Sequence, residues 1–173
     1  DTEKFYENVM NRYKYGGLDT PGLYLDETTM RICYSHRRLF AQLAKELVKQ
    51  GDNARAQKVL AYAEQAIPAY NVPQVYESGS YDIATAYASI GETGKAITLL
   101  NDLIAESRDY IDWAFSLGDS RIAMVQRDCL YKFWQWNQCN GLLKDMDKER
   151  YKQSNQQFEE KYMRLAQLMN YQN

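Results

Sequence analysis

The chain has 173 residues, a net charge of -2, and 25% charged residues of both signs. This size favours a single domain with its own core. The near-neutral charge argues against nucleic acid or an anionic membrane as the partner, because both need a basic surface. Three prolines and nine glycines argue against a turn-rich all-β fold, and three cysteines cannot form a fully paired disulfide framework. No apolar run is long enough for a membrane span, so we expect no direct membrane insertion by this segment.

Residues 1–25 are expected to hold a short helix and a loop. The helix is predicted to stop at Gly16 and Gly17, since glycine commonly follows the last turn of a helix. Asp26 is a suitable N-cap for a long helix, because its carboxylate can accept a free amide of the first turn. Apolar residues then recur at steps of three and four up to Gly51.

The rest of the chain is predicted to form two helix hairpins and a pair of capping helices. The hairpins cover residues 26–70 and 75–117, and the capping helices cover residues 119–173. The loop Ala69–Gln74 between the hairpins is expected to pack over their seam. The helix predicted over Ser120–Gln138 is apolar nearly all round, so we expect it to be buried on two sides.

Two helix boundaries depend on turn-forming residues. The second hairpin is expected to begin with a helix over Val75–Ile90, followed by a partner helix over Thr93–Leu117. Asn140 and Gly141 are expected to break the chain between the two capping helices.

The two hairpins align with each other at an offset of 40 residues, the separation of Gly51 and Gly91. Small residues recur where the paired helices cross, which lets their backbones approach closely. The aligned pairs are Leu43 and Ile83, Ala44 and Ala84, Leu47 and Tyr87, Ala56 and Ala96, and Leu60 and Leu100.

Both blocks resemble the tetratricopeptide repeat. The first block, residues 37–70, has Phe40 at the Trp position of the repeat pattern and closes on Pro68. The second block, residues 77–110, is weaker, since Ser80 stands at the Trp position. We therefore expect an all-α fold, a right-handed array of antiparallel helix hairpins of the tetratricopeptide-like α-solenoid kind, forming one helical-repeat domain over residues 1–173. The alternative is a generic array of amphipathic hairpins.

Several longer stretches are similar to the C-terminal region of a bacterial membrane-protein family of unknown function. They are Asn11–Gly17, Tyr24–Arg31, His36–Leu43 and Ile67–Pro73. Members of that family carry an N-terminal multi-span region that looks like protein O-mannosyltransferases, followed by a soluble helical-repeat domain. The resemblance implies a domain attached to a membrane-embedded region, on the periplasmic side of the inner membrane. It carries over no functional residue.

The sequence offers little for catalysis. His36 is the only histidine, and it could pair with Cys33 one helical turn away, but no third orienting group is evident and a packing role is the stronger interpretation. Cys129 and Cys139 are ten residues apart on one predicted helix, which is too far for a disulfide. We expect buried, inert thiols, no metal site and no cofactor.

The concave side of the array is the candidate binding surface. The first helix of each hairpin lines that side in such arrays, and the residues off the packing stripe are Arg38, Lys45, Lys49, Tyr81 and Thr85. The three cations could receive an acidic peptide end or another anion, although a solvated face is the more common explanation for such residues.

These observations predict a non-catalytic interaction domain that binds a protein partner or its own membrane domain. The alternative is an accessory domain that positions the acceptor of a membrane glycosyltransferase.

Overall fold

The computed structural model describes residues 1–170. This part of the chain contains seven α-helices and no strand, so the expectation of an all-α fold is confirmed. The chain divides into two compact units, residues 1–99 and residues 100–173, and the boundary falls within one long helix, α5.

Unit 1 is built around α2. Its elements, in chain order, are α1 (Thr2–Glu7), a π-helical turn (Asn8–Arg12), α2 (Glu27–Lys49), α3 (Asn53–Ala66), a 3₁₀ turn (Tyr76–Ser78), α4 (Ser80–Ser89) and the start of α5 (Thr93–Ser116). Side chains cap α2 and α3 as expected: Asp26 accepts a hydrogen bond from the amide of Thr29 at 2.8 Å, and Asp52 accepts one from the amide of Arg55 at 3.0 Å.

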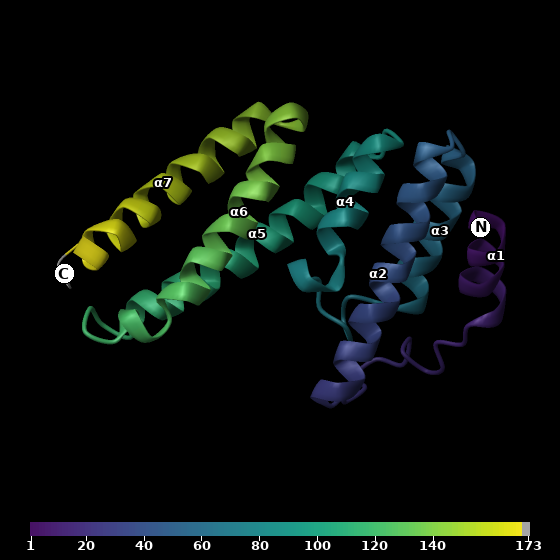
Figure 1. Ribbon diagram of the computed structural model, residues 1–173, viewed down its shortest axis with the longest axis horizontal. Helices are drawn as coiled ribbons and strands as arrows, with labels where there is room; N and C mark the ends of the chain where they lie inside the picture. The colour runs from purple at the N-terminus through teal and green to yellow at the C-terminus, as the bar shows by residue number, and fades with distance from the viewer. Residues whose placement is uncertain (171–173) are drawn as a thin grey trace. The chain divides into compact units, whose positions relative to one another are not determined.

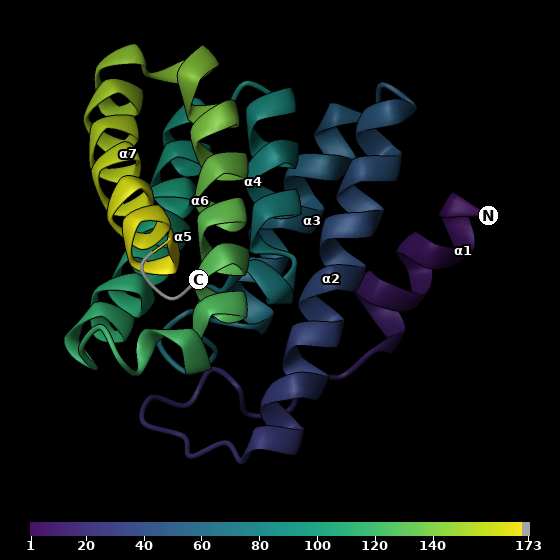
Figure 2. The same ribbon diagram turned by 60° about the vertical axis from the view of Figure 1, so that its left-hand side comes forward.

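α2 packs against both α3 and α4, and Figures 1 and 2 show these helices side by side. The positions that align between the two predicted hairpins are equally inaccessible. Ala44, Ala84, Ala56 and Ala96 are all 0% exposed, as expected for small residues at helix crossings. Large side chains, including Phe40, Leu43, Leu47, Leu60 and Tyr87, fill the space around them.

The turns after α2 and α4 are also alike. Gly51 and Gly91 have φ angles of 76° and 86°, in the left-handed region. The amide of Asp52 donates to the carbonyl of Leu47, and the amide of Glu92 donates to that of Tyr87, both at 2.9 Å. The 40-residue alignment thus extends to the main-chain hydrogen bonds of the turns.

Two helices of unit 1 are shorter than predicted. The N-terminal helix ends at Arg12 instead of Gly16, because Tyr13 takes an extended conformation with ψ of 145°. The predicted start of the helix over Val75–Ile90 is wrong. A 3₁₀ turn occupies Tyr76–Ser78 and Gly79 follows with φ of 85°, a conformation incompatible with a continuous helix, so α4 begins at Ser80.

Gly79 also marks the closest approach of this segment to α2. A Cβ atom added at Gly79 would lie 2.9 Å from Cγ and 3.1 Å from Cα of Arg38. Only a residue without a side chain fits there.

Gly79→Ala is therefore expected to destabilise the protein more than Gly91→Ala. Both positions have positive φ and share the cost of placing alanine in that region, but a Cβ at Gly91 meets nothing within 4 Å. Urea unfolding should show an additional loss of about 1–3 kcal/mol for Gly79→Ala. Equal losses in the two variants would contradict the close approach to α2.

A second prediction concerns the crossing of α2 and α3. Ala56→Leu should overpack this fully buried site and lower the free energy of unfolding by about 1–3 kcal/mol. Ala61→Leu, at an exposed position of α3, is the matched control and should change stability little. An unchanged urea midpoint for Ala56→Leu would argue against this packing.

Unit 2 contains the rest of α5, a 3₁₀ turn (Ile122–Met124), α6 (Gln126–Met146) and α7 (Lys148–Asn170). The predicted break at Asn140 and Gly141 is wrong, since α6 continues to Met146. Asn140 is buried and its Oδ1 accepts a hydrogen bond from the Ser154 hydroxyl on α7 at 2.6 Å. Gly141 is exposed, where glycine costs a helix only about 1 kcal/mol.

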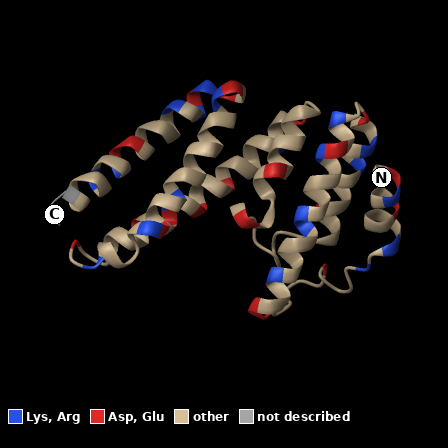
Figure 3. Cartoon of the chain, in the orientation of Figure 1, with Lys and Arg blue, Asp and Glu red and all other residues tan. Residues whose placement is uncertain are grey.

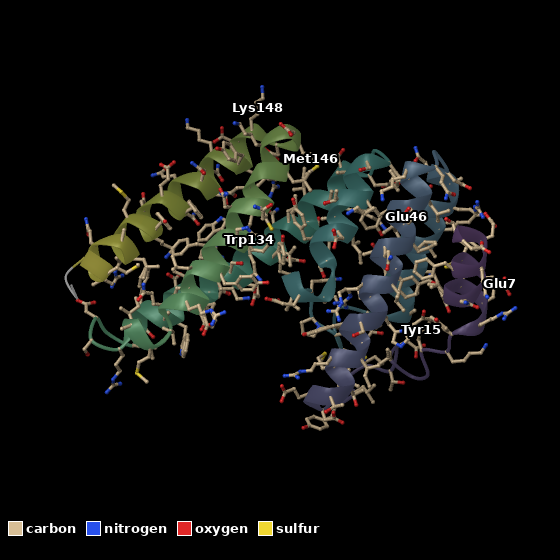
Figure 4. The ribbon with its side chains drawn as sticks, in the orientation of Figure 1. Glu7, Tyr15, Glu46, Trp134, Met146 and Lys148 are labelled. Carbon is tan, nitrogen blue, oxygen red and sulfur yellow. The ribbon has the colours of Figure 1, made fainter. Side chains whose placement is uncertain are left out.

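Aromatic side chains join α6 to α7. Phe133 and Trp136 meet Phe158 edge-on at centroid distances of 5.4 and 5.7 Å, and the indole of Trp136 donates to Ser154 at 2.7 Å. The prediction that α6 is buried on two sides is wrong for part of its surface. Leu130, Tyr131 and Trp134 are 38–47% exposed, and Figure 4 labels Trp134 on α6.

Candidate functional site

The predicted binding residues of α2 lie on one exposed face of that helix. Residues spaced by alternating steps of four and three share a helix face. Six such positions on α2 are all exposed and include four cations and no carboxylate: Arg31, Ser35, Arg38, Gln42, Lys45 and Lys49. We call these six residues the cationic face; Figure 3 shows Lys and Arg recurring along α2. Three of its cations were among the predicted binding residues, and Arg31 was not.

The cations of this face differ in how they are held. Arg38 donates to the carbonyl of Glu77 at 2.6 Å and to the hydroxyl of Ser35 at 2.9 Å. Arg31 pairs with Glu27 at 2.6 Å and Lys49 with Glu46 at 2.7 Å; Figure 4 labels Glu46. These exposed pairs are weak and exchangeable. Lys45 has no ion pair among the described residues, so its charge is available to a partner.

A groove of about 500 Å³ adjoins the first half of the cationic face. Its lining consists of Arg31, Tyr34, Ser35, Arg38, Val75 and Glu77. Two guanidinium groups beside an aromatic ring provide donors suited to a carboxylate.

Tyr81 and Thr85 of α4 are half-buried. The Tyr81 ring stacks on Tyr76 at 5.2 Å, in the same 3₁₀ turn whose Glu77 carbonyl binds Arg38. Thr85 donates its hydroxyl to the carbonyl of Tyr81 at 3.0 Å. The structure thus brings Arg38 and Tyr81 to one turn, and it places Lys45 and Lys49 two to three helical turns further along α2.

Arg37, which was not among the predicted binding residues, positions this region. It is 1% exposed and lies on the buried stripe of α2 that also carries Cys33 and Phe40. Its guanidinium donates to the carbonyls of Ile67 (3.2 Å), Val72 (2.6 Å) and Pro73 (2.8 Å) and to the hydroxyl of Ser78 (3.1 Å). Burial lowers its pKa to about 10, so the group stays cationic at neutral pH. A signal was present, since a charged residue on an apolar stripe must find buried partners.

Only part of the loop between the hairpins is buried, and its hydrogen bonds run to residues 18–20 and to Arg37 of α2. Val72 is 0% exposed and Asn71 donates to the carbonyls of Leu18 and Thr20 at 2.8 and 2.6 Å. The Tyr70 ring, expected to pack, is 63% exposed, and its hydroxyl donates to the carbonyl of Asp19 at 2.7 Å.

The other chemically interesting residues are buried in the packing. His36 lies half-buried between Tyr13 and Tyr15, with ring centroids 5.8 and 5.5 Å away, and its Nδ1 makes no hydrogen bond within the described part of the chain. All three cysteines are free and buried, which confirms that Cys129 and Cys139 do not bridge. Burial raises the thiol pKa of Cys33 and raises that of Cys139 to about 12, so these thiols stay protonated and unreactive at neutral pH.

Replacing Arg37 tests its role in the fold. Arg37→Leu should lower the free energy of unfolding by roughly 2–5 kcal/mol, because the buried carbonyls of Ile67 and Val72 lose their donor. Arg37→Lys should also destabilise the protein, since an ammonium group cannot reproduce the planar arrangement of donors of a guanidinium group. Arg31→Leu, at an exposed position of the same helix, is the control for urea unfolding. We call Arg37 and its four hydrogen-bond partners the Arg37 cradle. A loss of stability for Arg37→Leu no larger than that for Arg31→Leu would contradict this role.

No helix among residues 1–170 is both long enough and apolar enough to cross a bilayer. Comparison with known proteins gave no match to a family model, to a curated protein or to a solved structure.

Proposed function

We propose that this chain is a non-catalytic helical-repeat domain that binds an acidic peptide segment on the cationic face of α2. The observation that carries this proposal is the face itself: six exposed residues with four cations beside a groove lined by two guanidinium groups. From Arg31 to Lys49 it spans about 27 Å, which an extended segment of about eight residues covers.

The array is proposed to be tetratricopeptide-like. Support comes from the matching burial of Ala56 and Ala96, the matching turns at Gly51 and Gly91, and the packing of α2 on α3 and α4. In such arrays stacked hairpins create extended binding surfaces.

The partner segment is proposed to belong to another protein or to a membrane-embedded region of the same polypeptide. The second possibility, with its periplasmic location, rests on the family resemblance of the sequence. Both possibilities share one chemistry, a run of carboxylates complementary to the four cations.

A fluorescein-labelled peptide of eight residues with alternating Asp and Glu tests the proposal. Lys45→Glu with Lys49→Glu should weaken its binding, followed by fluorescence anisotropy, at least about tenfold, because both lysines are exposed on the face. The affinity should also fall as salt rises from about 0.05 to 0.3 M.

The matched control is Lys4→Glu with Lys58→Glu, which makes the same change of net charge at exposed positions of unit 1 outside the face. It should leave the affinity nearly unchanged. Equal losses in the two double variants, or equal binding of a peptide with Asn and Gln in place of the acids, would refute the cationic face as the site.

A further inference from the structure

A second pocket of unit 1 lies apart from the cationic face. It has a volume of about 360 Å³ and is bounded by the segment after α1 and the last turns of α3. This volume falls within the range of about 300–1,000 Å³ typical of small-molecule sites. Its lining includes Tyr13, Lys14, Tyr15, Asp19, Tyr62 and Gln65, and we call this site the tyrosine pocket.

The aromatic walls of this pocket are anchored in the core. Tyr15 packs on the fully buried Phe40 at 5.3 Å and edge-on against Tyr62 at 6.0 Å, and Tyr62 also meets Phe40 at 5.8 Å. Figure 4 labels Tyr15 where the chain after α1 passes α2. Burial raises the pKa of Tyr15, and its hydroxyl stays protonated and donates to the carbonyl of Val9.

The polar side of the pocket is also held in place. Asn71 binds the carbonyls of Leu18 and Thr20, and Tyr70 binds the carbonyl of Asp19, so the loop carrying Asp19 is attached to the loop after α3. A pocket whose walls are fixed before binding loses little entropy when a ligand enters.

The lining combines groups that suit hydroxyls. Lys14 supplies a cation that donates, Asp19 a carboxylate that accepts, and Gln65 an amide that does both. The opposite charges make the pocket neutral overall, so an anion would meet Asp19 and a cation would meet Lys14. An apolar ligand would bury both charges without partners. Hydroxyl groups, which donate and accept at once, satisfy all three side chains.

The tyrosines complete the match. Tyr13 lines the pocket and is 37% exposed, and an accessible tyrosine ring can offer a flat apolar face beside polar groups. A pyranose ring has the same two-sided character, with C–H groups on its faces and hydroxyls around its rim. We propose that the tyrosine pocket binds a neutral pyranose of a saccharide.

Binding to the whole chain can be measured with five neutral probes: methyl α-D-glucopyranoside, methyl α-D-mannopyranoside, methyl β-D-galactopyranoside, maltose and cellobiose. Saturation-transfer NMR and titration calorimetry should show saturable binding of at least one probe, with a Kd of roughly 0.1–10 mM. Tyr13→Ala and Asp19→Ala should each weaken it at least about tenfold.

Tyr24→Ala is the matched control, because Tyr24 is 88% exposed and lies outside the pocket. It should leave the affinity unchanged. Thermal unfolding verifies that each variant is folded, and Lys14→Ala, at an exposed position, replaces any variant that is not.

Three outcomes would overturn the proposal: no saturable binding by any of the five probes, an equal loss in Tyr24→Ala, or tighter binding of glucose 6-phosphate or glucosamine than of every neutral probe. The result is independent of the cationic face, since Lys45→Glu with Lys49→Glu should leave saccharide binding unchanged while weakening the acidic peptide.

Discussion

A single buried guanidinium organises unit 1. Arg37 is withdrawn from water, and removing a charge from water is costly unless hydrogen bonds replace its hydration. Its donors are matched by the end of α3 at Ile67, the following loop at Val72 and Pro73, and the 3₁₀ turn at Ser78. These partners are 30–41 residues away along the chain, so one side chain of α2 fixes where the second hairpin begins.

The candidate binding groove depends on this cradle. Val75 and Glu77 line this groove and lie between Pro73 and Ser78 in the chain. Arg37 forms hydrogen bonds with Pro73 and Ser78. The turn is secured further by Ser78, which donates to the carbonyl of Val75 at 2.7 Å, and by Ser80, which donates to Gln74. Gly79 then lets the turn lie against the backbone of α2 at Arg38. Interior hydrogen bonds thus position the exposed cations relative to the groove.

Periodicity and capping residues were sufficient to predict the helices of the core. Phe40, Ala44, Ala56 and Leu60 of the apolar stripes are fully buried, because an apolar stripe on a helix leaves water only by packing against another element. The errors occurred where tertiary contacts override local signals. Gly141 does not end α6, and the neighbouring Asn140 accepts a hydrogen bond from Ser154 on α7.

One candidate site could be predicted from the sequence and the other could not. Exposed cations at steps of three and four are visible in a sequence, so Lys45 and Lys49 could be named in advance. The tyrosine pocket could not, because Tyr13, Asp19 and Gln65 converge only through the path of the irregular segment after α1. Spacing carries no information about such a path.

The manner in which Arg37 holds its loop has an evolutionary consequence. Three of the four partners of Arg37 are main-chain carbonyls, at Ile67, Val72 and Pro73, and every amino acid has this group. Substitutions at these positions therefore leave the acceptors of Arg37 in place, provided that the buried Ile67 and Val72 remain apolar. The number of residues between Ile67 and Ser78 is constrained, since an insertion or deletion would move the carbonyls out of reach of Arg37. Among related chains this loop should keep its length even where its exposed residues vary, whereas surface loops usually tolerate insertions and deletions.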